Sequence, residues 1–208
     1  MINHLAILED GPWRRSPQCA ARLPEPCGTL AIAARANGRS NGDQGGLPFM
    51  SVSIAFMSAT REELDRADRE PSWGREYVYE LYASDPMPDR PHGGPGKAWA
   101  GLQFLLDEAE VNIEFLMDGS PILRDGTLFG WSAEQIESVA RLLRATPWER
   151  LAAHYAPERM TIEEVYPNTW QFDAEGELDW LERSYEELVA FFGEAAERGY
   201  GAFMGFSF

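Results

Sequence analysis

The sequence predicts an α+β protein, a single domain in which helices pack on a small sheet. Three observations support this fold class. Residues 50–57 open the predicted domain with strand-like alternation, and residues 200–208 close the chain with a second strand-like stretch. Most residues between them show the helical spacing of apolar side chains. A run of helices between two strands is typical of α+β folds, so we expect the first and last strands to share the sheet.

The domain is predicted to begin with one strand and two helices. Residues 51–56 alternate between small or polar and apolar side chains, as in a strand with one buried face. Thr60 and Glu63 have the spacing of a capping box, which predicts a short helix to about residue 70. The segment after Pro71 favours a helix because its aromatic and leucine side chains recur every four residues, although it also suits a strand.

The middle of the chain is predicted to contain a loop, a helix and a short strand. Prolines and glycines crowd residues 86–96, which indicates a loop. The apolar side chains that follow keep a helical stripe over 97–109. Residues 128–131 are predicted to form a short strand.

Three further helices are predicted before the last strand. Ser132 and Gln135 form a second capping-box pattern, which starts a helix that continues to about residue 143. A proline at a first-turn position predicts another helix over 147–155. The longest predicted helix covers 177–198, and Gly199 is well placed to end it.

Residues 1–49 differ in charge from residues 50–208. They carry 5 basic against 4 acidic residues, a net charge of +1, whereas residues 50–208 carry 13 against 30, a net charge of −17. We expect a disordered leader or an over-extended N-terminus, with the domain beginning at Met50. Arg14-Arg15 suggests a twin-arginine export signal as an alternative, but the following apolar run is shorter than the ~7 to 15 residues that such signals need.

Composition excludes several classes of protein. The net charge of −16 disfavours nucleic acid and anionic membrane surfaces as partners, because both would repel the chain. No apolar run approaches the ~18 residues that a membrane span needs. Two cysteines are too few for a disulfide scaffold, which fits the cytoplasm. We expect a soluble cytoplasmic protein with no metal and no cofactor.

Two motif-like segments lack the residues that their chemistry requires. Residues 91–98 are glycine-rich and contain a lysine, but a phosphate-binding loop needs a serine or threonine where Ala98 stands. The acidic residues of 173–179 would chelate calcium only with a glycine at the position of Leu178, so a solvated loop leading into a helix explains them better.

Four residues are candidate binding residues. Lys97 is the one lysine among 18 basic residues, and a site fitted to an ammonium group rejects the guanidinium of arginine. Its alternative is a solvated residue at the start of a helix, beside Trp99. Tyr166 and Trp170 flank a turn-prone segment in which an aromatic ring is expected to border a groove, whereas most other tryptophans are expected in the core.

The chain resembles the YfbM-like family, a bacterial domain of unknown function (domain of unknown function 1877). The resemblance extends over nearly all of residues 50–208 and rests on residues 51–56, Lys97-Ala98-Trp99 with the leucines after it, residues 132–139, Tyr166-Pro167 with Trp170, and residues 191–199. It implies a single cytosolic α+β domain with no established activity or cofactor.

Two functions follow from these observations. The first is a non-enzymatic binding module for a basic protein or peptide, because residues 158–198 carry 12 acidic against 3 basic residues and an acidic face steers a basic partner. The alternative is a small-molecule enzyme of the hydrolase type with a pocket near Lys97 and Tyr166–Trp170. The sequence nominates no catalytic residue for it.

Overall fold

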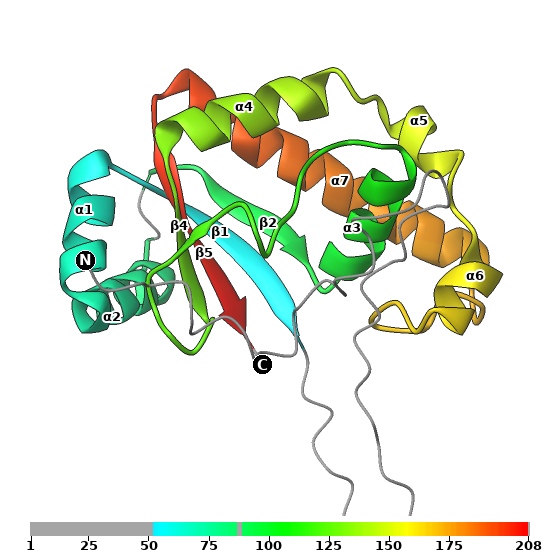
Figure 1. The fold of residues 1–208 in the computed structure, drawn as a ribbon, viewed down its shortest axis with the longest axis horizontal. Coiled ribbons are helices and arrows are strands. Elements are labelled where there is room, and N and C mark those ends of the chain that lie inside the picture. The colour runs from blue at the N-terminus through cyan, green and yellow to red at the C-terminus, as the bar shows by residue number, and fades with distance from the viewer. Residues whose placement is uncertain (1–51, 87–88, 208) are drawn as a thin grey trace, which may run out of the picture.

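The computed structural model describes residues 52–86 and 89–207. These residues form one antiparallel sheet and a set of packed helices, which confirms the predicted α+β class (Figure 1). The expectations for residues 1–49 and for a start at Met50 lie outside the described residues.

The sheet is built around a pairing between the two ends of the domain. Its strands are β1 (Ser53–Ala59), β2 (His92–Gly96), β3 (Ser120–Pro121), β4 (Leu128–Trp131) and β5 (Gly201–Ser207). They lie in the order β2-β1-β5-β4-β3. β1 and β5 pair along their full length, from Ser53 opposite Ser207 to Ala59 opposite Gly201. The predicted union of the first and last strands is therefore confirmed.

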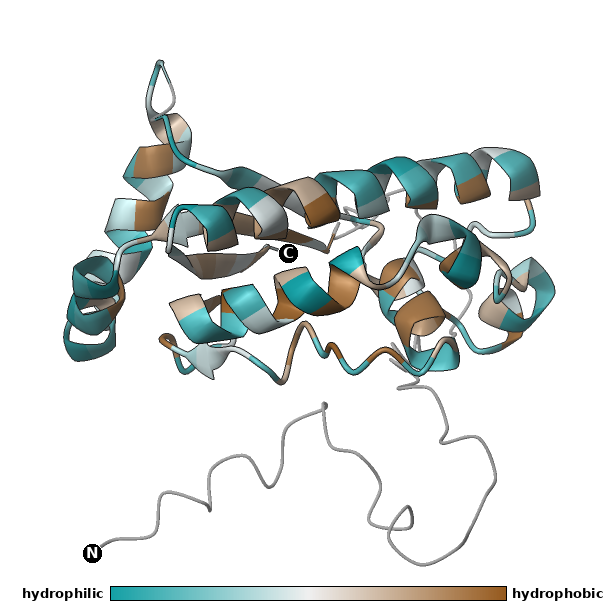
Figure 2. Ribbon diagram, turned by 90° about the horizontal axis from the view of Figure 1, so that it is seen from above, coloured by the Kyte–Doolittle hydropathy of each residue, from teal (hydrophilic) through white to brown (hydrophobic). Residues whose placement is uncertain are grey.

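Seven helices surround this sheet within the described part of the chain. They are α1 (Arg61–Arg69), α2 (Pro71–Ala83), α3 (Trp99–Glu108), α4 (Ala133–Arg144), α5 (Trp148–Ala152), α6 (Pro157–Ile162) and α7 (Ala174–Glu197). Both predicted capping boxes are present, at the start of α1 and at the start of α4. In Figure 2 the helices are banded in hydrophilic and hydrophobic colours, as expected for helices that bury one face.

The sheet separates two hydrophobic clusters. Successive side chains of a strand point to opposite faces, so Met204 and Phe206 enter the main cluster while Phe203 enters the smaller one. The main cluster contains side chains of α3, α4 and α7, and the smaller one contains side chains of α1 and α2. None of the described helices has the length and apolar character to cross a bilayer.

The structure corrects the predicted loop over 86–96, because residues 92–96 form β2 and pair with β1. The sequence of β2 consists mostly of glycine and proline, so it shows no alternation of polar and apolar side chains that would predict a strand. Gly94 has a φ of 144°, and a Cβ there would lie 3.2 Å from Cα of Ala55. Glycine thus allows a close approach to β1 that other residues would resist.

The helix boundaries near the second half of the chain also differ from the predictions. α5 ends at Ala152 rather than at about residue 155, and the short helix α6 and strand β3 were not predicted. α7 begins at Ala174, three residues earlier than predicted, because Asp173 caps it by accepting a hydrogen bond from the N–H of Gly176 at 3.2 Å. The acidic residues 175–179 therefore belong to a helix and not to a loop.

Candidate functional site

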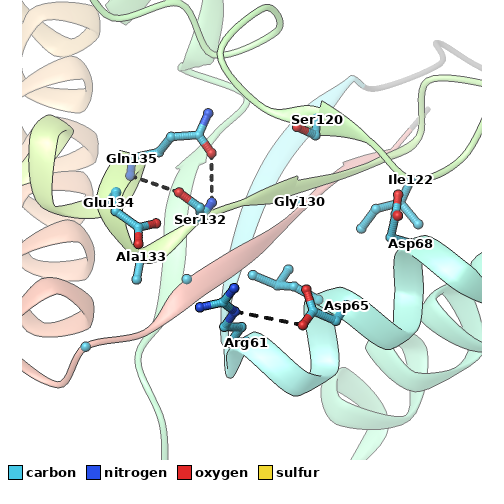
Figure 3. A pocket seen from close by; sticks show the side chains of 13 residues that line it. Arg61, Asp65, Asp68, Ser120, Ile122, Gly130, Ser132, Ala133, Glu134 and Gln135 are labelled. Atoms are coloured by element: carbon cyan, nitrogen blue, oxygen red, sulfur yellow. Dashed lines mark hydrogen bonds and ion pairs between the residues drawn. The ribbon is translucent and has the colours of Figure 1, made fainter.

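A cleft of about 460 Å³ lies between α1, the start of α4 and the sheet (Figure 3). We call it the α1–α4 cleft. Its apolar lining comes from Leu64 and Ile122, and Gly130 and Gly201 belong to adjacent strands of the sheet beneath it. The charged side chains of the lining are Arg61, Asp65, Asp68 and Glu134. The volume lies in the range of about 300 to 1,000 Å³ that is usual for ligand sites.

The charges of the α1–α4 cleft are mainly negative. Nε of Arg61 lies 3.9 Å from Oδ2 of Asp65, which is one turn further along α1. The pKa of Glu134 is lowered, chiefly by hydrogen bonds from its own backbone N–H and from Ser132, with a smaller contribution from Arg61. The lining therefore contains three carboxylates and one guanidinium, and that guanidinium already pairs with Asp65.

A second, shallower hollow lies at the start of α7. This α7 groove has a volume of about 380 Å³ and is lined by Pro167, Thr169, Asp173, Gly176, Glu177 and Trp180. Its indole, Trp180, stacks on the buried Trp170 with ring centroids 6.2 Å apart and an angle of 20° between the rings. The buried ring thus supports the partly exposed one.

Two large apolar side chains are exposed on the segments that flank the α7 groove. Phe172, just before α7, is 88% exposed, and Ile162, the last residue of α6, is 80% exposed. A third large apolar residue, Trp180, is half-buried in the groove itself. Large exposed apolar side chains around a hollow are a common feature of interaction sites.

The carboxylates around the α7 groove have no cationic partner within the part of the chain that the structure describes. Among the described residues, no ion pair is formed by Asp173, Glu175, Glu177 or Asp179. The nearby Arg159 is already engaged, with Glu108 and Glu163 each 2.6 Å from its guanidinium. The surface at the start of α7 therefore carries an uncompensated negative charge.

Besides burial, two of these carboxylates contribute to a raised pKa at Tyr155. Burial raises the pKa of its phenol to about 12, and the charges of Glu177 and Asp173 contribute to the increase. The hydroxyl of Tyr155 donates a hydrogen bond to the carbonyl of Trp170 at 3.5 Å. Tyr155 thus places a neutral hydroxyl beside the groove and stays protonated at neutral pH.

The structure brings two of the four predicted binding residues together. Trp99, the first residue of α3, is 4% exposed and stacks on the half-buried Tyr166 with centroids 6.4 Å apart. The hydroxyl of Tyr166 accepts a hydrogen bond from the N–H of Val52 at 3.1 Å. Both rings therefore help to hold β1 and α3 together.

The other two predicted residues have different surroundings. Lys97 is exposed just before α3 and lines neither of the two hollows described above. The expectation that Trp170 borders a groove is wrong, because its side chain is fully buried and its Nε1–H donates to the carbonyl of Val165 at 2.7 Å. The tryptophan that lines the α7 groove is Trp180, from the acidic start of α7, and not Trp170.

Sequence reasoning missed Ile162, Phe172 and Trp180 as surface residues. All three are apolar, and apolar residues near turns are assigned to a core by default. The available signal was their position next to acidic residues in the sequence. Among the described residues, no group of three or more histidine, cysteine, aspartate or glutamate side chains is arranged to hold a metal ion.

The described residues form an α+β domain whose surface includes the α1–α4 cleft and the α7 groove. The chain belongs to the family described as Domain of unknown function (DUF1877), which matches residues 50–204. This match confirms the resemblance noted in the sequence. No protein among the curated sequences matches the chain.

A similar fold is found in the crystal structure of YfbM from Escherichia coli, a protein of unknown function. YfbM shares 16% sequence identity with this chain, and the match has a TM-score of 0.54. The match covers 74% of this chain and 99% of the YfbM chain. At this identity the likeness supports the shared fold alone.

Proposed function

We propose that the protein is a non-enzymatic binding module that docks a basic protein or peptide at the start of α7. The docking surface consists of the apolar side chains Ile162, Phe172 and Trp180 and the carboxylates Asp173, Glu175, Glu177 and Asp179. We call this set the α6–α7 surface. Its chemistry fits a partner that alternates apolar and cationic side chains.

The exposure of Phe172 beside Asp173, which forms no ion pair within the described residues, is the observation that carries this proposal, and Ile162 adds a second exposed apolar side chain. Full burial of a side chain of this size stabilises by about 1.5 to 3 kcal/mol, so an apolar partner would gain from covering both. Aromatic side chains are frequent binding hot spots when a partner excludes water from them. Trp180, supported by Trp170, adds an aromatic ring in the adjoining α7 groove.

The charge of the surrounding segment favours a basic partner. Residues 158–182 contain eight acidic residues and one basic residue, Arg159. The guanidinium of Arg159 is neutralised by its contacts with Glu108 and Glu163. A uniform negative potential accelerates the encounter with a basic partner and repels an acidic one.

Substitution of the exposed apolar side chains tests the proposal. The probe is a short peptide of alternating lysine and leucine, and its matched control carries glutamate in place of lysine. We expect the wild-type protein to bind the lysine peptide, and the Phe172→Ser variant to bind it at least about fivefold more weakly. The control variant Tyr79→Ser removes an aromatic that is 74% exposed on α2 and should bind like the wild type.

Two results of this experiment would contradict the proposal. Equal binding of the lysine and glutamate peptides would show that charge plays no part. Equal weakening by Phe172→Ser and Tyr79→Ser would show that the peptide has no preferred surface. Calorimetric titration of each variant, with its thermal unfolding measured in parallel, distinguishes both results from a loss of folding.

The alternative function, a small-molecule hydrolase, has less support. Its predicted pocket near Lys97 and Tyr166–Trp170 would need the lysine beside the α7 groove, and Lys97 does not line that groove. The groove offers carboxylates and an indole but no serine, cysteine or histidine side chain in its lining. The one hydroxyl of the lining, that of Thr169, has no histidine in the same lining to act as its general base.

A further inference from the structure

We propose that the α1–α4 cleft is a second binding site, which takes the side chain of an arginine or lysine from a partner peptide. This inference does not depend on the α6–α7 surface. The cleft includes Gly199, which follows the end of α7, whereas the α7 groove contains residues from the first turns of the same helix. A helix of 24 residues is about 36 Å long, so the two sites lie far apart.

The floor of the cleft suits an aliphatic chain. Leu64 of α1 and Ile122 supply its apolar surface, and Figure 3 shows Ile122 near Gly130 of β4. A Cβ added to Gly130 would lie 3.3 Å from Cδ1 of Ile122 and 3.4 Å from Cδ2 of Leu64. Leu64 and Ile122 thus cover Gly130 closely, and the apolar surface that these two side chains present to the cleft suits the methylene stem of an arginine or lysine.

The charged rim of the cleft suits the cationic end of the same side chain. Asp65 and Asp68 come from α1, and Glu134 comes from the opposite wall at the start of α4. Arg61 offsets one of these charges through its pair with Asp65. Asp68 forms no ion pair within the described ranges. A guanidinium or ammonium group would therefore meet two uncompensated carboxylates.

An anionic ligand fits the cleft poorly, although a helix begins there. Helix N-termini attract anions through their free N–H groups. At α4 these groups are already engaged, because the hydroxyl of Ser132 accepts from the N–H of Gln135 at 3.2 Å and the carboxylate of Glu134 interacts with its own N–H. A phosphate or carboxylate would meet Glu134 and both aspartates at the rim.

The test compares two capped glycine pentapeptides that differ only in the central residue, which is arginine in one and citrulline in the other. Citrulline has the same shape as arginine but no charge. We expect the arginine peptide to bind and the citrulline peptide to bind at least about fivefold more weakly, a difference typical of exposed ion pairs. NMR titration of the backbone amides is expected to shift signals of α1, β4 and the start of α4.

Three variants sharpen the test. Asp68→Asn should weaken binding by about two- to fivefold, and Arg61→Ala should strengthen it because a competing cation is removed. Gly130→Ala places a methyl group against Ile122 and Leu64 on the floor and should weaken binding, and its unfolding temperature is measured in parallel because both side chains must shift to accept the methyl group. Glu187→Gln, exposed on α7 and outside both the cleft and the α6–α7 surface, is the control and should change nothing.

The proposal is overturned if neither peptide binds, if citrulline binds as well as arginine, or if Arg61→Ala weakens binding. The last result would show that Arg61 contributes to the peptide site and does not compete with the peptide for the carboxylates. Free arginine is a further probe, because binding of the free amino acid but not of the peptide would assign the cleft to a small molecule instead of a partner chain. The Phe172→Ser variant should bind the arginine peptide normally, so failure of the α6–α7 surface and failure of the cleft give different results.

Discussion

Gly101 of α3 lies directly against the indole of Trp170, so closely that a Cβ at position 101 would overlap Cη2 of the ring and lie 2.8 Å from Cδ2 of Leu181. Because Gly101 has no side chain, the indole of Trp170 can pack directly against its backbone. Trp170 in turn stacks on Trp180, which lines the α7 groove. A glycine in the core thus determines which indole reaches the surface.

This contact predicts that Gly101→Ala destabilises the protein by about 1 to 3 kcal/mol, because the added methyl group must displace Trp170 or Leu181. Gly193 is a matched control. It also lies within a helix, α7, but a Cβ there would meet nothing within 4 Å. Gly193→Ala should therefore stabilise by about 0.5 to 1 kcal/mol through its higher helix propensity. Urea denaturation of both variants measures the difference, and a change of the same sign in both would refute the packing argument.

Substitutions of Lys97 and of Trp99, which lie close together in the sequence, are expected to differ in their effect on stability. Trp99→Ala should cost about 3 to 5 kcal/mol, because it removes a buried indole that packs on Tyr166 and Phe206. Lys97→Arg should change stability by less than about 0.5 kcal/mol, since Lys97 is exposed.

The Lys97→Arg variant also tests whether Lys97 binds a ligand. A compact ammonium donor is not replaced by a planar guanidinium, so weaker peptide binding by Lys97→Arg at unchanged stability would support the role predicted from the sequence. Binding equal to that of the wild type would remove it. Thermal unfolding and peptide titration of Lys97→Arg provide both readouts.

Glu63 joins α1 to α2 and to the segment before β2. Its carboxylate accepts hydrogen bonds from the N–H of Thr60 at 2.7 Å, from the hydroxyl of Tyr77 and from the guanidinium of Arg90 at 3.1 Å. Burial alone would raise the pKa of Glu63, but the hydrogen bonds from Tyr77 and Arg90 outweigh burial, and the pKa is lowered below its usual 4.5.

This lowered pKa predicts an acid-sensitive contribution to stability. A carboxyl group whose pKa is lower in the folded state stabilises the protein above its unfolded pKa, and the contribution disappears as the pH falls through the folded pKa. Glu63→Gln keeps the capping box but removes the charge, so it should cost about 1 to 3 kcal/mol at neutral pH and flatten the loss of stability below about pH 4.5. Glu137→Gln, on the exposed face of α4, is the control and should change stability by less than about 0.5 kcal/mol. A Glu63→Gln protein with the acid profile of the wild type would contradict this account.

The parts of the fold that could be predicted are those with local signals. Capping boxes at Thr60 and Ser132 fix helix starts through hydrogen bonds within four residues, and alternation in 51–56 marks a strand. β2 could not be predicted in this way, because its glycines and proline carry no side-chain pattern. Its pairing depends on the approach of β1, which is distant in sequence.

The candidate site was predicted only in its general location. The acidic composition and the turn after Tyr166 indicated a segment of which Pro167 and Thr169 line the α7 groove. The choice between Trp170 and Trp180 depends on the close contact of Trp170 with Gly101 of α3, which no local pattern records. Exposure of Phe172 likewise follows from the tertiary arrangement.

The central claim is that the α6–α7 surface binds a basic partner through its uncompensated carboxylates. The most direct test measures the affinity of the lysine–leucine peptide for the wild type, for Glu177→Lys and for the control Glu137→Lys, at low salt and near physiological salt. Between about 0.01 and 0.15 M salt the Debye length falls from about 30 to about 8 Å, which screens surface charges. We predict weaker binding at the higher salt, a loss of about tenfold for Glu177→Lys and a much smaller change for Glu137→Lys. Affinity that is independent of salt, or equal losses in both variants, would contradict the account.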